Sequence, residues 1–247
     1  MTVPDSADHM IPGKATARTA GVLYLVVAVT GGFSMLYVPS LMVPGDVAAT
    51  ADNLVAHSSL FRLGIVSGLV CQVAFVFLAL ALYQLFKGVN RTHASVMVAL
   101  VVAAVPVAFL NMLNQLAALR IVSGADYLAV LQRDQLNALM MLFLDLHSQG
   151  LLIVEIFWGL WLVPLGLLVI KSRFMPGFLG VLLIIGSIGY CVDFLTRLLF
   201  PSYTAMVSPI AGASKFGELA MILWLVFKGV GSQPARAGSV PRVVERS

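Results

Sequence analysis

The side chains of this sequence that are best suited to chemistry interrupt long apolar stretches. They are Glu155, Asp193, Arg197, Lys215 and Glu218. Ionisable groups are costly within the hydrocarbon of a membrane, so they usually mark a functional site or an internal ion pair. An arginine in such a set could hold an anionic group, and Glu155 or Glu218 could take up a proton.

Further polar residues fall at a similar depth of the apolar stretches. Asn111, Asn114 and Gln115 lie close together, Arg62 begins another stretch, and His147 precedes Glu155 by two helical turns. We predict that all these residues line or border one ligand-binding pocket, with His147 near its mouth. The opposite halves of the apolar stretches carry no charge away from their ends.

Internal pairing is an alternative explanation for these charges. Asp193 and Arg197 are four residues apart, and Lys215 and Glu218 are three apart, so each pair shares one face of a helix. Such pairs can hold a bundle together without binding anything. Both interpretations stay open at this point.

Catalytic and metal-binding signatures are weak. Asp145 and His147 point about 200° apart on a helix and cannot chelate one metal ion. Ser148 lies in no G-x-S-x-G motif. We therefore predict no metal and no cofactor, and the catalytic residues stay unknown. An enzyme acting on a lipid would need Asp145, His147 and Glu155 to converge within about 3 Å.

Composition sets the class of protein. Hydrophobic residues make up 60% of the chain and charged residues 11%, whereas soluble domains average about 25% charged residues. A multi-pass membrane protein is the class that fits. The net charge of +4 comes from scattered basic residues, which favours contact with lipid headgroups over nucleic acid. The lipid bilayer is the expected partner, and protein partners stay unknown.

Six segments are long enough to cross a bilayer as helices, which need about 20 residues each. They are residues 20–37, 61–86, 94–119, 151–170, 178–199 and 209–227. As one helix, residues 135–170 would extend about 54 Å, well beyond a hydrocarbon core of about 30 Å. This segment must therefore either begin outside the membrane or bend near Gly150.

Lysine and arginine are concentrated in alternate loops, which predicts that both termini are cytoplasmic. We expect a cytoplasmic tail over residues 1–14, a transmembrane domain over 15–228, and a disordered cytoplasmic tail over 229–247. The abundance of Arg, Ala, Val and Gly suits a bacterial genome, so a bacterial plasma membrane is the expected location.

Two outer loops have the pattern of short surface helices. Pro44-Gly45-Asp46 is a turn with a helix cap, and apolar residues follow at helical spacing. The segment beginning at Ser123-Gly124 repeats the pattern before Tyr127 and Val130. We predict two short helices that cover an outward-facing polar pocket.

Several segments together resemble an uncharacterised bacterial membrane family, domain of unknown function 4386. They are TARTAGVLY (16–24), FRLGI (61–65), SGADY (123–127), LDLHS (144–148), FMPGFLG (174–180), GYCVD (189–193) and Gly217-Glu218. The resemblance covers residues 15 to 230 and implies a helical multi-pass membrane protein. It implies no activity.

We conclude that the fold is all-α, a membrane bundle of six transmembrane helices. The favoured function is binding of a small or amphiphilic ligand in the outward-facing pocket, and transport of that ligand is an extension of this hypothesis. An intramembrane lipid-modifying enzyme and a non-catalytic scaffold or accessory protein are the alternatives.

Overall fold

The protein is all-α over residues 13–229, which are the residues that the computed structural model describes. The predicted tails therefore lie outside the described residues, apart from Gly13, Lys14 and Gly229. The helices, in chain order, are α1 (Lys14–Ser40), α2 (Val47–Ala56), α3 (Ser58–Phe86), α4 (Arg91–Val122), η1 (Asp126–Leu128), α5 (Arg133–Leu160), α6 (Leu162–Lys171), α7 (Gly177–Leu199), η2 (Pro201–Tyr203), α8 (Thr204–Ser214) and α9 (Phe216–Phe227).

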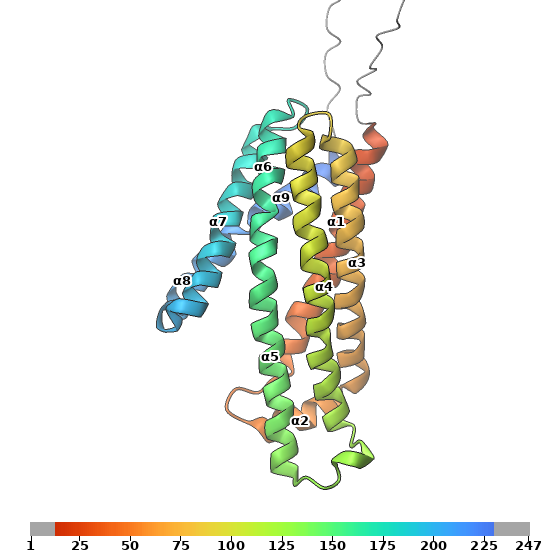
Figure 1. Ribbon diagram of the computed structural model, residues 1–247, viewed down its shortest axis with the longest axis vertical. Helices are drawn as coiled ribbons and strands as arrows, with labels where there is room; N and C mark the ends of the chain where they lie inside the picture. The colour runs from red at the N-terminus through yellow and green to blue at the C-terminus, as the bar shows by residue number, and fades with distance from the viewer. Residues whose placement is uncertain (1–12, 230–247) are drawn as a thin grey trace, which may run out of the picture.

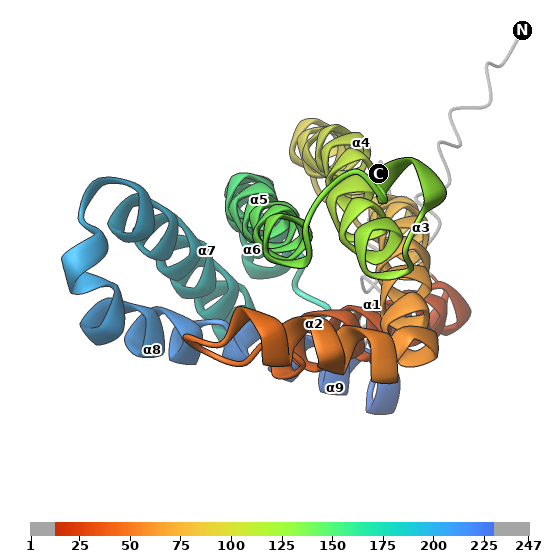
Figure 2. The same ribbon diagram turned by 90° about the horizontal axis from the view of Figure 1, so that it is seen from below.

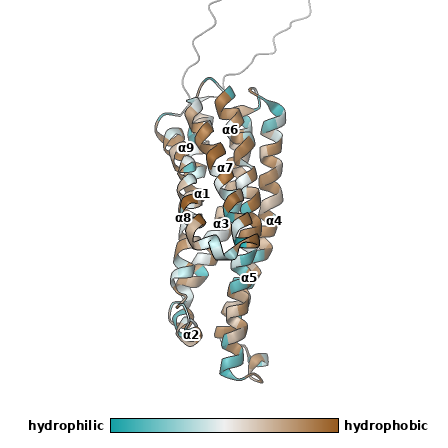
Figure 3. Cartoon of the chain, turned by 90° about the vertical axis from the view of Figure 1, so that its left-hand side faces the viewer, coloured by the Kyte–Doolittle hydropathy of each residue, from teal (hydrophilic) through white to brown (hydrophobic). Residues whose placement is uncertain are grey.

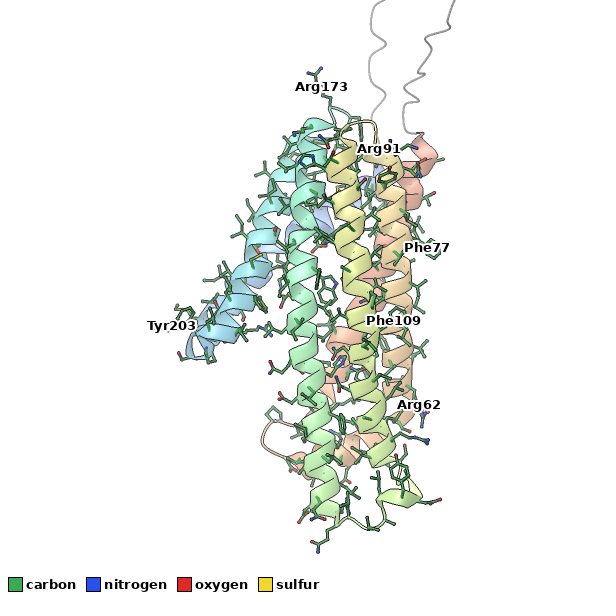
Figure 4. The ribbon with its side chains drawn as sticks, viewed as in Figure 1. Arg62, Phe77, Arg91, Phe109, Arg173 and Tyr203 are labelled. Carbon is green, nitrogen blue, oxygen red and sulfur yellow. The ribbon has the colours of Figure 1, made fainter. Side chains whose placement is uncertain are left out.

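Six segments of the described chain are long and apolar enough to cross a membrane, which confirms the predicted number. They are Ala15–Ser40, Ser58–Phe86, Arg91–Val122, Arg133–Lys171, Gly177–Leu199 and Pro201–Phe227. Large apolar side chains cover the outside of these helices, as Phe77 and Phe109 illustrate (Figure 4). Such an apolar exterior suits contact with lipid chains.

The two described chain ends lie at one end of the bundle, which we name the terminal end (Figure 1). The opposite end carries α2 and η1, and we name it the loop end (Figure 2). The α3–α4 and α6–α7 connections, marked by Arg91 and Arg173, lie at the terminal end (Figure 4). This alternation is the one that an even number of spans produces.

The fourth span contains 39 residues, or about 58 Å of helix against a hydrocarbon core of about 30 Å. α5 runs without interruption through Gly150, and the segment is interrupted further along, at Trp161, just before α6 begins. The interruption arises because Pro164 has no N–H to donate to the carbonyl of Leu160. The loop-end part of α5 extends well past the α7–α8 turn (Figure 1).

The sixth span is divided into α8 and α9, with Lys215 between them. The backbone N–H of Lys215 donates to the carbonyl of Gly212 at 3.1 Å, a tighter turn than an α-helix makes. α9 packs against α1, where a Cβ atom on Gly21 would lie 2.9 Å from the backbone of Leu225. α8 instead packs against α7, and this hairpin diverges from α1 and α3 (Figure 1).

Of the two predicted surface helices, the first is present and the second is not. Asp46 caps α2 by accepting the backbone N–H of Ala49 at 2.8 Å. The second segment forms only η1, a single turn. Leu128 packs against the apolar cluster beneath α2, but Tyr127 and Val130 make little contact, since they are 69% and 86% exposed.

Three apolar clusters form the core of the described residues. The largest fills the terminal half and contains Phe75 and Trp161, and the second joins α2 to the loop-end parts of α3, α4 and α5. The third is small and joins α4 to α5 through Ala104, Ala108 and Val154. In Figure 3 the hydrophobic colour dominates α6 and α7, and the hydrophilic colour is strongest near the chain turns. Between the two larger clusters, the residues of α1 and α3 belong to neither of them, and several line the candidate site.

Candidate functional site

A cavity of about 650 Å³ lies between α1, α3, α5, α7 and the break at Lys215. Its long wall is α1, whose lining residues begin at Tyr24 and continue to Pro39. Along this wall the side chains are mostly apolar or absent, as at Val27, Gly31 and Gly32. Charged groups enter from the other helices: Glu155 from α5, Arg197 from α7, and Lys215 and Glu218 from the last span.

An ion-pair network joins three of these helices. The Nζ atom of Lys215 lies 2.5 Å from Oε1 of Glu155 and 3.7 Å from Oδ2 of Asp193. The break in the sixth span produces this geometry, because it leaves Lys215 where it contacts both α5 and α7. The predicted pairing of Lys215 with Glu218 is not among the ion pairs of the described residues.

Asp193 is the most enclosed member of this network, with 2% of its surface exposed. It accepts a hydrogen bond from Oγ of Ser208 at 2.5 Å. The guanidinium of Arg197 lies 3.3 Å from the same carboxylate, as the four-residue spacing predicts. The side chain of Arg197 is 46% exposed, so one face of this cation is accessible.

Glu218 forms a separate polar group with two tyrosines. Its Oε2 accepts from the hydroxyl of Tyr24 at 2.7 Å, and its Oε1 accepts from the hydroxyl of Tyr190 at 2.9 Å. The ring of Tyr190 also carries the Nζ atom of Lys215 over its face, 4.1 Å from the ring centre. Tyr190 therefore links Glu218 to the ion-pair network.

The two tyrosines are functional residues that the sequence reasoning missed. Their position within apolar spans could have indicated them, because the hydroxyl of a tyrosine in such a span needs a hydrogen-bond partner. Glu218 also lies deeper than expected. It is ten residues before Lys228, about 15 Å at 1.5 Å per residue, and so lies near mid-span.

The predicted residues of α4 join α4 to α5 instead of facing the cavity. Nδ2 of Asn111 donates to the carbonyl of His147 at 2.9 Å, and Nδ1 of His147 donates to the carbonyl of Asn111 at 3.2 Å. Asn114 donates to Oδ1 of Asn111 at 3.0 Å. Gln115 is buried beside them. Of this group, His147 lines the cavity.

Arg62 and Asp145 lie apart from the other predicted residues. The side chain of Arg62 is exposed on the outside of α3 and points away from the cavity (Figure 4). Asp145 is exposed on α5 and does not line the cavity. Asp145 therefore does not converge with His147 and Glu155, and the Nδ1 atom of His147 is already hydrogen-bonded to a backbone carbonyl. This geometry does not favour the acid–base enzyme.

Comparisons with known proteins identify the family of the chain. The family model named "Domain of unknown function (DUF4386)" matches residues 19–229. An uncharacterized protein of Archaeoglobus fulgidus is 43% identical over 74 residues, which is 30% of this chain. The match covers 43% of the length of that relative. The relative is archaeal, so it does not support the expected bacterial origin. No solved structure matches the chain.

Proposed function

We propose a function for this chain, which belongs to the DUF4386 family: it binds a small amphiphilic molecule in the cavity beside α1. The observation that carries this proposal is one partly open cavity that has both apolar and charged walls. Ligand sites usually measure about 300–1,000 Å³ and combine apolar walls with a few polar groups. This cavity has that size and that composition.

The arrangement of the walls supports an amphiphile. An apolar chain would lie along Val27, Gly31 and Met35 of α1, and a polar head would lie among Glu155, Lys215 and Glu218. The α7–α8 hairpin diverges from α1 (Figure 1). We propose that a molecule dissolved in the membrane enters from this side without crossing water.

Orientation and location are part of the proposal. The basic connections near Arg91 and Arg173 lie at the terminal end (Figure 4), which by the positive-inside rule is the cytoplasmic end. The cavity would then open toward the exterior of a bacterial plasma membrane. Transport would require the apolar cluster around Phe75 and Trp161, which fills the terminal half, to open.

Filling the cavity tests the proposal. A Cβ atom on Gly32 has open space around it, and Gly32 lines the cavity. Gly212 has equally open space but does not line it. Gly32→Leu should therefore occlude the site, and Gly212→Leu is the matched control.

Binding is followed by tryptophan fluorescence, because Trp158 and Trp161 line the cavity. The protein in zwitterionic lipid nanodiscs is titrated with amphiphiles that share a dodecyl chain and carry an ammonium, a sulfate or a phosphocholine head. At least one should give a saturable change that Gly32→Leu weakens by tenfold or more and Gly212→Leu preserves. Saturable binding that Gly32→Leu leaves intact would contradict the proposal, as would binding of none of the three.

A further inference from the structure

We infer that the head of the bound molecule is a protonated amine, which binds at Glu218 in exchange for a proton. This inference rests on the proposed function and names the chemical class of its ligand. It follows from the charge balance of the site, from the donors and acceptors left over, and from the aromatic walls.

The charge balance leaves one carboxylate without a cation. Lys215 lies between Glu155 and Asp193, and Arg197 also contacts Asp193. Among the residues that the structure describes, Glu218 has no ion-pair partner within 4 Å, and its two bonded neighbours are neutral phenols. The site thus contains three carboxylates against two cations.

Glu218 is partly buried, and a carboxylate withdrawn from water without a cation favours taking up a proton or binding a positive ion. Each carboxylate oxygen has two acceptor positions, and the tyrosines occupy one on each. Two acceptor positions therefore remain for the N–H groups of an ammonium head. A phosphate or sulfate head would instead add negative charge beside Glu218.

The surroundings of Glu218 favour an amine independently of charge. Tyr24, Trp158 and Trp161 line the cavity, and aromatic rings attract cations; the ring of Tyr190 already holds Lys215 in this way.

The exchange is balanced in atoms and charge. The O–H bond of the Glu218 carboxylic acid breaks, its proton passes to water, and the carboxylate pairs with the ammonium head. The other titratable or charged groups that border this space are Tyr24 on α1, Cys71 on α3, His147 and Glu155 on α5, Tyr190, Asp193 and Arg197 on α7, and Lys215 at the break. The basic side chains among them are already engaged: Lys215 and Arg197 in ion pairs, and His147 with a carbonyl.

Because a proton and an amine compete for one carboxylate, amine affinity should fall as pH falls. The limit for one exchanged proton is about tenfold per pH unit. We expect dodecylamine, which stays protonated between pH 6 and 8 because alkyl amines titrate near about 10, to bind the nanodisc-embedded protein more tightly at pH 8. Dodecyl sulfate should bind at least tenfold more weakly than dodecylamine at that pH.

Substitutions test whether the pH dependence of amine binding comes from Glu218. Glu218→Gln should lose the pH dependence and at least tenfold in dodecylamine affinity, whereas Asp52→Asn, at an exposed ion pair with Arg133, should change neither. Tighter binding of dodecyl sulfate, or an unchanged pH dependence in Glu218→Gln, would overturn the inference and leave the proposed function standing. Failure of all three dodecyl compounds would remove the proposed function itself. If Glu218→Gln is not recovered folded, the comparison of head groups on the unmodified protein decides.

Discussion

Asp193 and Lys215 connect the helices of the charged network, so their loss should cost more than the loss of Arg197. Lys215→Met leaves Glu155 and Asp193 without the cation between them and should lower the free energy of unfolding by about 3 kcal/mol. Arg197→Met removes a cation that is 46% exposed, for which we expect about 1 kcal/mol or less. Denaturant titrations in one detergent measure both; equal losses would contradict the network.

The hydroxyl of Tyr190 should also contribute measurably to stability. Tyr190→Phe keeps the ring under Lys215 but removes one hydrogen-bond donor from the partly buried Glu218. We expect a loss of about 1–3 kcal/mol in the free energy of unfolding. Tyr203→Phe serves as the control, because its side chain is exposed at the α7–α8 turn (Figure 4). A Tyr190→Phe variant as stable as the control would show that Glu218 does not need this donor.

At the residue scale, the sequence indicated which charged residues lie near one another, but it indicated few of their ion-pair partners. Charges within apolar runs indicated Glu155, Asp193, Arg197, Lys215 and Glu218, and the four-residue spacing predicted the Asp193–Arg197 pair. Spacing did not predict that Lys215 contacts Glu155, since that contact joins helices 60 residues apart in the chain. Arg62 shared the expected depth, but depth does not determine which side of a helix faces inward.

At the scale of elements, the close approach of α4 and α5 depends on a glycine. A Cβ atom on Gly150 would overlap the side-chain amide of Asn111, which donates to His147. Gly150→Ala should therefore lower the melting temperature by several degrees. Gly32→Ala, with open space around its Cβ, should be neutral or slightly stabilising because alanine favours helix. Thermal melting of both variants checks this, and a Gly150→Ala protein as stable as Gly32→Ala would contradict the packing.

The helix breaks show what the sequence can and cannot indicate about elements. Proline within a span favours a kink, and the fourth span is interrupted three residues before Pro164, at Trp161. Pro106 also lies within a span, yet α4 is continuous through it. The break at Lys215 has no proline or glycine at that position. It coincides with the contacts of Lys215 to α5 and α7, which are tertiary interactions and therefore not readable from local sequence.

For the whole molecule, composition predicted the class, and the lengths of the apolar segments predicted the number of spans, because hydrocarbon allows few spanning structures other than helices. Orientation remains a prediction from the loop charges. A green fluorescent reporter fused after Ser247 should fluoresce, and the same reporter inserted near Asp126 should not. Alkaline phosphatase at these positions should give the opposite pattern. A cytoplasmic signal from the Asp126 insertion would contradict the proposed orientation.

The central claim is that the cavity beside α1 holds one amphiphilic molecule. The most direct test is native mass spectrometry of the protein released from its own membrane, compared with Gly32→Leu and Gly212→Leu. We predict that the unmodified protein and Gly212→Leu retain one bound amphiphile of defined mass, while Gly32→Leu retains none. Equal retention by all three proteins, or no defined bound mass on any of them, would contradict the account.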